Sequence, residues 1–137
     1  MNGIRKVLIL TIFTALTLLS SFPTLYAAYG LWYTTGNVQC SFPDGSTVAR
    51  VKVHLLKKQT SLVPPYGYFE LLCSYSNSDT KTVTTTAKPT GWKIEWLFLV
   101  NGYEACRAST SGTGFPVTAD NESCPQKATV TISAPTH

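Results

Sequence analysis

Hydrophobic and polar positions alternate along most of the chain after residue 30, in short runs that end at glycine, proline, asparagine, aspartate or serine. A period of two is typical of β-strands, because successive side chains of a strand point to opposite faces. No long stretch has the 3.6-residue spacing of an amphipathic helix. The alternating runs are residues 34–40, 49–56, 68–75, 82–87, 92–100, 103–109 and 127–133, whereas 111–121 has the composition of a loop. They predict an all-β fold of about seven strands, either an antiparallel sandwich or a partly closed barrel.

The run 92–100 has the strongest pattern. One of its faces carries Trp92, Ile94, Trp96, Phe98 and Val100. Leu97 and Leu99 make the opposite face apolar as well, which predicts a central strand covered on both sides. Asn101-Gly102 follows at once and suits the positive φ angles of a type I′ turn, so residues 103–109 should pair back on this strand.

The first 27 residues have a different pattern. Arg5 and Lys6 precede an apolar run at residues 7–19, and small residues follow at Ala27 and Ala28. The apolar run would span only about 20 Å as a helix, which is too short for a hydrocarbon core of about 30 Å. The pattern predicts a secretory signal peptide at 1–27 and a single secreted β domain at 28–137, with no membrane segment after cleavage.

All four cysteines follow the predicted signal peptide, at Cys40, Cys73, Cys106 and Cys124. An even number in a small exported chain predicts disulfides, because the secretory pathway oxidises thiols. A zinc site would bring its ligands in close pairs along the sequence, whereas these cysteines are widely separated. We therefore expect two disulfide bridges, no metal and no cofactor. The spacing leaves all three possible pairings open.

Composition and charge narrow the function. Charged residues make up 13% of the chain and aromatic residues 12%, which predicts a packed core rather than disorder. Loss of residues 1–27 removes Arg5 and Lys6, so the net charge falls from +4 to +2. The remaining basic residues are scattered, whereas a nucleic-acid interface needs them clustered on one face. Binding of nucleic acid is not expected.

No set of residues predicts a catalytic site. His54 lies in the middle of a predicted strand and His137 is the last residue, so a Ser-His-Asp or Cys-His arrangement lacks a member. Glu70, Glu95 and Glu104 could in principle form the carboxylate pair of a glycosidase. Each lies opposite an apolar face, however, where contact with solvent explains it. We expect the protein not to be an enzyme.

Two features suggest carbohydrate. Exposed aromatic rings can stack on sugars, and the candidates for such a platform are Trp32, Tyr33, Tyr66, Tyr68 and Tyr103. Asn121-Glu122-Ser123 is an N-glycosylation sequon in a polar segment, which predicts a glycan on Asn121.

Several short motifs resemble those of a known family. Gly36-Asn37-Val38-Gln39-Cys40 opens the domain and Phe69-Glu70-Leu71-Leu72-Cys73 follows as an alternating strand. Thr90-Gly91-Trp92 starts the strongest run, and Cys106 and Cys124 complete the set. This order resembles the olive-pollen major allergen family of secreted plant proteins, which includes extensin-like wall proteins and phylloplanin-like leaf-surface proteins. The chain lacks a third pair of cysteines, and in this respect it is similar to the phylloplanin-like branch.

The resemblance implies a secreted, non-enzymatic protein of the extracellular space or cell wall that takes part in plant defence against microbes. Its expected partner is a cell-wall polysaccharide or a component of a microbial surface. The resemblance also implies a nested pairing, Cys40 with Cys124 and Cys73 with Cys106. The predicted hairpin agrees, because it carries Cys106 back beside the strand 92–100, toward the core that Cys73 should face.

Two alternatives stay open. The nematode transthyretin-like secreted family shares the sandwich and an early Gly-x-x-x-Cys strand. A lectin-like carbohydrate-binding module or a secreted inhibitor would instead act through exposed loops. Binding to glycans would favour the lectin-like alternative over the phylloplanin-like one.

Overall fold

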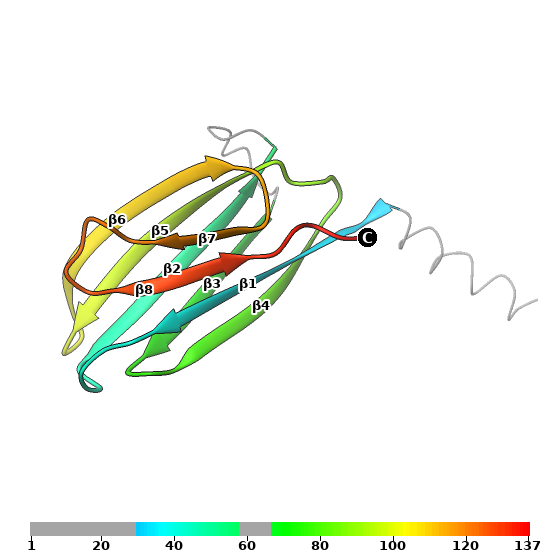
Figure 1. Cartoon of the computed structure of the whole chain (residues 1–137). Helices are drawn as coiled ribbons and strands as arrows, with labels where there is room; N and C mark the ends of the chain where they lie inside the picture. Colours follow the sequence, from blue (N-terminus) through cyan, green and yellow to red (C-terminus); the bar gives the residue numbers. More distant parts are fainter. Residues whose placement is uncertain (1–29, 58–66) are drawn as a thin grey trace, which may run out of the picture. The chain divides into compact units, whose positions relative to one another are not determined.

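The alternating runs form two antiparallel sheets (Figure 1). The computed structural model describes residues 30–57 and 67–137, so the predicted signal peptide and Tyr66 lie outside the described residues. Within them the strands are β1 (Trp32–Cys40), β2 (Thr47–Leu56), β3 (Gly67–Ser74), β4 (Ser78–Thr85), β5 (Gly91–Val100), β6 (Tyr103–Thr113), β7 (Val117–Asp120) and β8 (Ala128–Ile132). They belong to one compact unit, Trp32–Thr136.

Sheet A has the strand order β4-β1-β8-β7, and sheet B has the order β3-β2-β5-β6. The two sheets pack face to face, and neither closes on itself. The predicted all-β antiparallel sandwich is therefore confirmed, and the partly closed barrel is not what forms. In the described part of the chain, no helix is long and apolar enough to cross a membrane.

The core lies between the sheets, where alternate residues of each strand meet. Sheet B contributes Ile94, Trp96 and Phe98 from β5, which are fully buried as the pattern predicted, and sheet A contributes Val38 and Val130. β5 is a central strand, as predicted, because it lies between β2 and β6. The prediction that both of its faces are covered is wrong. Leu97 and Leu99 on the outer face stay partly exposed, and no described element covers them.

The predicted type I′ hairpin is confirmed. Asn101 and Gly102 have φ angles of 52° and 84°, and Val100 pairs with Tyr103. The register shifts once, between Phe98 and Leu99, where β6 carries an extra residue. β6 runs on to Thr113, beyond the predicted end of this strand.

β7 is an eighth strand that the pattern did not predict. The whole of 111–121 was expected to be a loop because of its glycine, serine, threonine and proline content. Four of its residues pair with β8, from Val117 opposite Ile132 to Asp120 opposite Thr129. Ala119 is buried against the core. Pairing and burial thus override a weak local preference.

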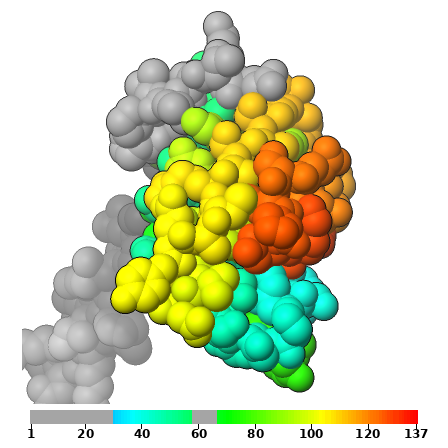
Figure 2. Space-filling model, turned by 90° about the vertical axis from the view of Figure 1, so that its left-hand side faces the viewer, coloured from blue at the N-terminus to red at the C-terminus, as the bar shows by residue number. Residues whose placement is uncertain are grey.

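All four cysteines form disulfides, as predicted, but the predicted pairing is wrong. Cys40 bonds Cys73, with Cα atoms 5.8 Å apart, and Cys106 bonds Cys124, with Cα atoms 5.9 Å apart. The first bridge joins β3 of sheet B to β1 of sheet A. The second bridge joins β6 of sheet B to the segment between β7 and β8, two strands of sheet A. In Figure 2 the yellow atoms of the β5–β6 hairpin lie beside the orange and red atoms of β7 and β8, the side held by the second bridge.

The strand register explains why Cys73 cannot reach Cys106. Ala49 on β2 is opposite Cys73 on β3 and Phe98 on β5, and Phe98 is in turn opposite Cys106 on β6. The two cysteines therefore end one row that crosses the whole of sheet B. Three inter-strand spacings separate them by about 14 Å, twice the Cα separation that a disulfide allows.

Candidate functional site

Charged side chains gather on the outer face of sheet B. Strand alternation places the core residues of β2, β3 and β5 on one side and these polar residues on the other. We call this surface the charged face. It carries Arg50, Lys52, His54, Glu70, Lys93, Glu95, Glu104 and Arg107.

Register arranges the centre of the charged face in two rows. In the first row Lys52 lies between Glu70 on β3 and Glu95 on β5. In the second row Leu97 lies between Arg50 on β2 and Arg107 on β6. Residues from strands that are far apart in sequence are thus brought side by side.

Each glutamate of the charged face has a cationic neighbour. The Nε group of Arg50 donates to Oε1 of Glu70 at 3.1 Å, and Nε of Arg107 donates to Oε1 of Glu104 at 3.2 Å. The hydrogen bonding to Glu104, and then its negative charge, raise the pKa of the Arg107 guanidinium. Two of the three glutamates are thus each paired with an arginine.

Glu95 has two neighbours of its own. Nε2 of His54 and Nζ of Lys93 each lie 3.6 Å from a carboxylate oxygen of Glu95. The His54 ring is half-buried rather than solvent-facing, with its centroid 5.2 Å from that of Tyr68. The hydroxyl of Tyr68 donates to Oε2 of Glu70 at 3.3 Å. Burial, and then the charge of Glu70, raise the pKa of Tyr68 above its ordinary value.

A hollow of about 250 Å³ opens in the middle of the charged face. It is lined by Arg50, Lys52, Glu95, Trp96, Leu97 and Arg107. Arg50 uses only Nε for its bond to Glu70, so its two terminal nitrogens have no partner among the described residues. Nζ of Lys52 likewise makes no ion pair in the described part of the chain. The hollow therefore offers cationic donors to a ligand.

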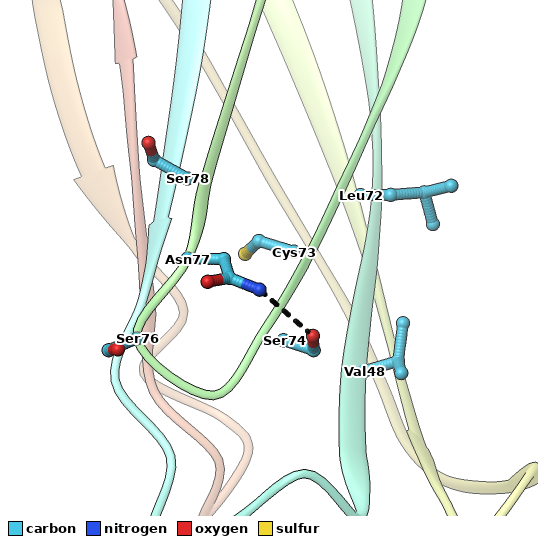
Figure 3. A pocket seen from close by; sticks show the side chains of 7 residues that line it. All are labelled: Val48, Leu72, Cys73, Ser74, Ser76, Asn77 and Ser78. Atoms are coloured by element: carbon cyan, nitrogen blue, oxygen red, sulfur yellow. Dashed lines mark hydrogen bonds between the residues drawn. The ribbon is translucent and has the colours of Figure 1, made fainter.

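A second, more open hollow of about 630 Å³ lies at the turn between β3 and β4 (Figure 3). Its lining is Val48, Leu72, Cys73, Ser74, Ser76, Asn77 and Ser78. Nδ2 of Asn77 lies 3.4 Å from Oγ of Ser74, and the backbone of Asn77 donates to the carbonyl of Ser74 at 2.8 Å, so the turn holds itself in place. None of the described residues that line this hollow has an ionisable side chain, so it offers a ligand fewer charged contacts than the first hollow does.

The structure does not assemble the predicted aromatic platform. Tyr33 lies on the outer face of sheet A, whereas Tyr68, which is 48% exposed, lies on the outer face of sheet B. Trp32 is partly buried, with Nζ of Lys88 5.4 Å from its ring centroid. Tyr66 lies outside the described residues. Since strand alternation points Tyr33 and Tyr68 to opposite sides of the sandwich, a shared flat surface is impossible.

Asn121, the asparagine of the predicted glycosylation sequon, is buried in the structure. Its side chain is only 1% exposed, and its Oδ1 accepts a hydrogen bond from the backbone N–H of Cys124 at 3.3 Å. Nδ2, the atom that would carry a glycan, is buried without a partner among the described residues. The turn that brings Cys124 to its bridge folds the asparagine inward, which a three-residue sequon does not report.

Arg50, Lys52, Leu97 and Arg107 were not predicted to form one set. The signal was present in part, because each of them stands opposite a core position in a predicted strand. What was lacking was the register between strands, which decides which polar residues become neighbours.

No group of three or more metal-ligating side chains suited to holding a metal ion occurs among residues 30–57 and 67–137. Comparison with protein-family models and with curated proteins finds no match to this chain.

Proposed function

We propose that this chain is a secreted, non-enzymatic protein of the extracellular space or cell wall that acts by binding a partner. The observation that carries the proposal is the pairing of all four cysteines into bridges that tie the two sheets together. Such bridges persist in oxidising compartments and are rare in the cytosol. The signal peptide predicted at 1–27 supports the same route.

The charged face supports binding rather than catalysis. Its three glutamates are the carboxylates that a glycosidase could use, and each of them lies beside a cation. An ion pair of this kind accounts for each glutamate without a catalytic role. A hollow with cationic donors fits instead the recognition of an anionic partner. A cell-wall polysaccharide or a component of a microbial surface is the partner we propose.

The proposal depends on the disulfides and the charged face more than on the olive-pollen resemblance. That resemblance implied the nested cysteine pairing, and the pairing in the structure is different. The defence role against microbes that it implies is kept as a prediction of this proposal. Inhibition of spore germination by the purified domain would support it.

Expression of residues 1–137 in a eukaryotic cell culture tests the secretion itself. We expect the protein in the medium, shortened by about 27 residues and with no thiol that reacts with an alkylating reagent before reduction. A matched chain that starts at Ala28 behind a new methionine should stay inside the cell. Retention of the full chain in the cells with four reactive thiols would contradict the proposal.

A further inference from the structure

We infer that the hollow on the charged face binds the carboxylate groups of an acidic polysaccharide, one whose repeating units are uronic acids. This inference rests on the proposed function and names its ligand. Three of the residues that line the hollow are cations, Arg50, Lys52 and Arg107, against one carboxylate, Glu95. The lining therefore has an excess of positive charge, although Arg50 and Arg107 are also paired with Glu70 and Glu104 beside it.

The donors suit a carboxylate in particular. The unused terminal nitrogens of Arg50 form a planar pair, and a guanidinium of this kind binds a carboxylate through two parallel hydrogen bonds. Lys52, two residues along the same strand, adds a point charge about 7 Å away. Together they can hold one carboxylate or two adjacent ones.

The spacing of the cations suits a polymer. Arg50 and Arg107 belong to one row with Leu97 between them, so two inter-strand spacings separate their backbones by about 10 Å. A ligand that repeats its negative charge can meet both arginines and Lys52 at once. A single small anion could not bridge Arg50 and Arg107.

The rest of the hollow suits a sugar ring. Leu97 gives its floor an apolar surface for the C–H face of a pyranose, and Glu95 can accept hydrogen bonds from hydroxyl groups. Tyr68, half-exposed, lies in the next row toward the end of β2, where a longer chain would pass. These groups add a sugar-specific element to the charge.

An acidic peptide fits less well because of where the hollow lies. Arg50 and Lys52 are on β2 and Glu95 and Leu97 are on β5, and both strands are paired on their two sides. Extended peptides bind preferentially at a free sheet edge, through main-chain hydrogen bonds that an interior strand cannot offer. Recognition here must come from side chains alone.

The test is titration calorimetry of the purified, oxidised domain with a galacturonic acid oligomer of about ten units, since such a ligand covers several strand spacings. We expect binding that weakens as salt is added, because exposed charges are screened. The double variant Arg50→Gln with Lys52→Gln should bind at least about tenfold more weakly, since it loses charge-assisted hydrogen bonds. Lys57→Gln removes one exposed charge outside the hollow and should bind as the parent does.

Two further ligands test the inference, and either of them would contradict it by binding as tightly as the galacturonic acid oligomer. The same oligomer with its carboxyl groups methyl-esterified keeps every sugar ring and loses the charge, so equal binding would overturn the role of the carboxylates. Poly-glutamate that binds as tightly, with the same loss in the double variant, would reassign the hollow to acidic peptides. Absence of binding to the oligomer by a protein that is secreted and fully oxidised would overturn this inference and leave the proposed function standing.

Discussion

The ring of Phe69 on β3 lies directly against Gly36 on β1, so closely that a β-carbon at residue 36 would overlap Cε2 and Cζ of the ring. Four residues further along both strands, Cys40 bonds Cys73. Val38 and Leu71, midway between these contacts, are fully buried. The two short motifs 36–40 and 69–73 therefore face each other across the sandwich and form one contact between the sheets.

Replacement of Gly36 by alanine should lower the stability of the domain. The new methyl group must displace the Phe69 ring, and overpacking of a filled core costs about 1–3 kcal/mol. Chemical denaturation should show this loss for Gly36→Ala. Gly45→Ala is the matched control, because a β-carbon there meets nothing within 4 Å. Phe69→Leu added to Gly36→Ala should recover part of the loss, and equal stability of Gly36→Ala and the parent would contradict the contact.

Double cysteine substitutions should lower the melting temperature by an amount that depends on whether they break one bridge or both. Cys40→Ala with Cys73→Ala removes one bridge of sequence separation 33, and Cys106→Ala with Cys124→Ala removes one of separation 18. Chain entropy assigns about 3–4 kcal/mol to each of these bridges. The crossed pair Cys40→Ala with Cys106→Ala breaks both bridges and should have the lowest melting temperature of the three. If a crossed pair is as stable as a matched pair, the observed pairing is wrong.

Asn121 should carry no glycan in the secreted protein. Its Nδ2 is buried and its Oδ1 holds the backbone N–H of Cys124. Treatment with an N-glycosidase should leave the mass unchanged. Asn121→Ala should destabilise the domain by about 1–3 kcal/mol, because it leaves a buried backbone donor without its acceptor. A glycan found at this residue on folded protein would contradict the burial of its side chain.

Ionisation of Tyr68 should destabilise the fold. Burial and the neighbouring Glu70 raise its pKa above 10.0 in the folded domain. The unfolded chain therefore loses this proton first, so the stabilisation present below pH 10 is lost as pH rises through the folded-state value. Absorbance titration of tyrosinate should show that Tyr68 ionises above the ordinary pH range of a tyrosine. Glu70→Gln should move its pKa back toward the ordinary value, and no movement would contradict the contact with Glu70.

The sequence predicts the strands and the core well, for a physical reason. Alternation is a local property, so Trp92, Ile94, Trp96 and Phe98 could be assigned to the core before any partner strand was known. The Asn101-Gly102 turn is also local, since its two residues tolerate positive φ. β7 could not be predicted in this way, because only its pairing with β8 makes it a strand.

The pairing of the cysteines and the candidate site depend on the order of strands in each sheet. β3 and β6 became opposite edges of sheet B, which keeps Cys73 from Cys106. The same order brings Arg107 into the row of Arg50. Neither relationship can be found from spacing along the chain, because residues adjacent across a sheet can be tens of positions apart.

The most direct test of this account is a map of the disulfides in the secreted protein, digested with trypsin without reduction. Cleavage after lysine and arginine places each cysteine in a different peptide, which are the one ending at residue 50 and those covering 59–81, 94–107 and 108–127. The structure predicts that the peptide ending at Arg50 is linked to 59–81, and that 94–107 is linked to 108–127. Linkage of 59–81 to 94–107 would contradict the arrangement of the two sheets and the row of cations built on it.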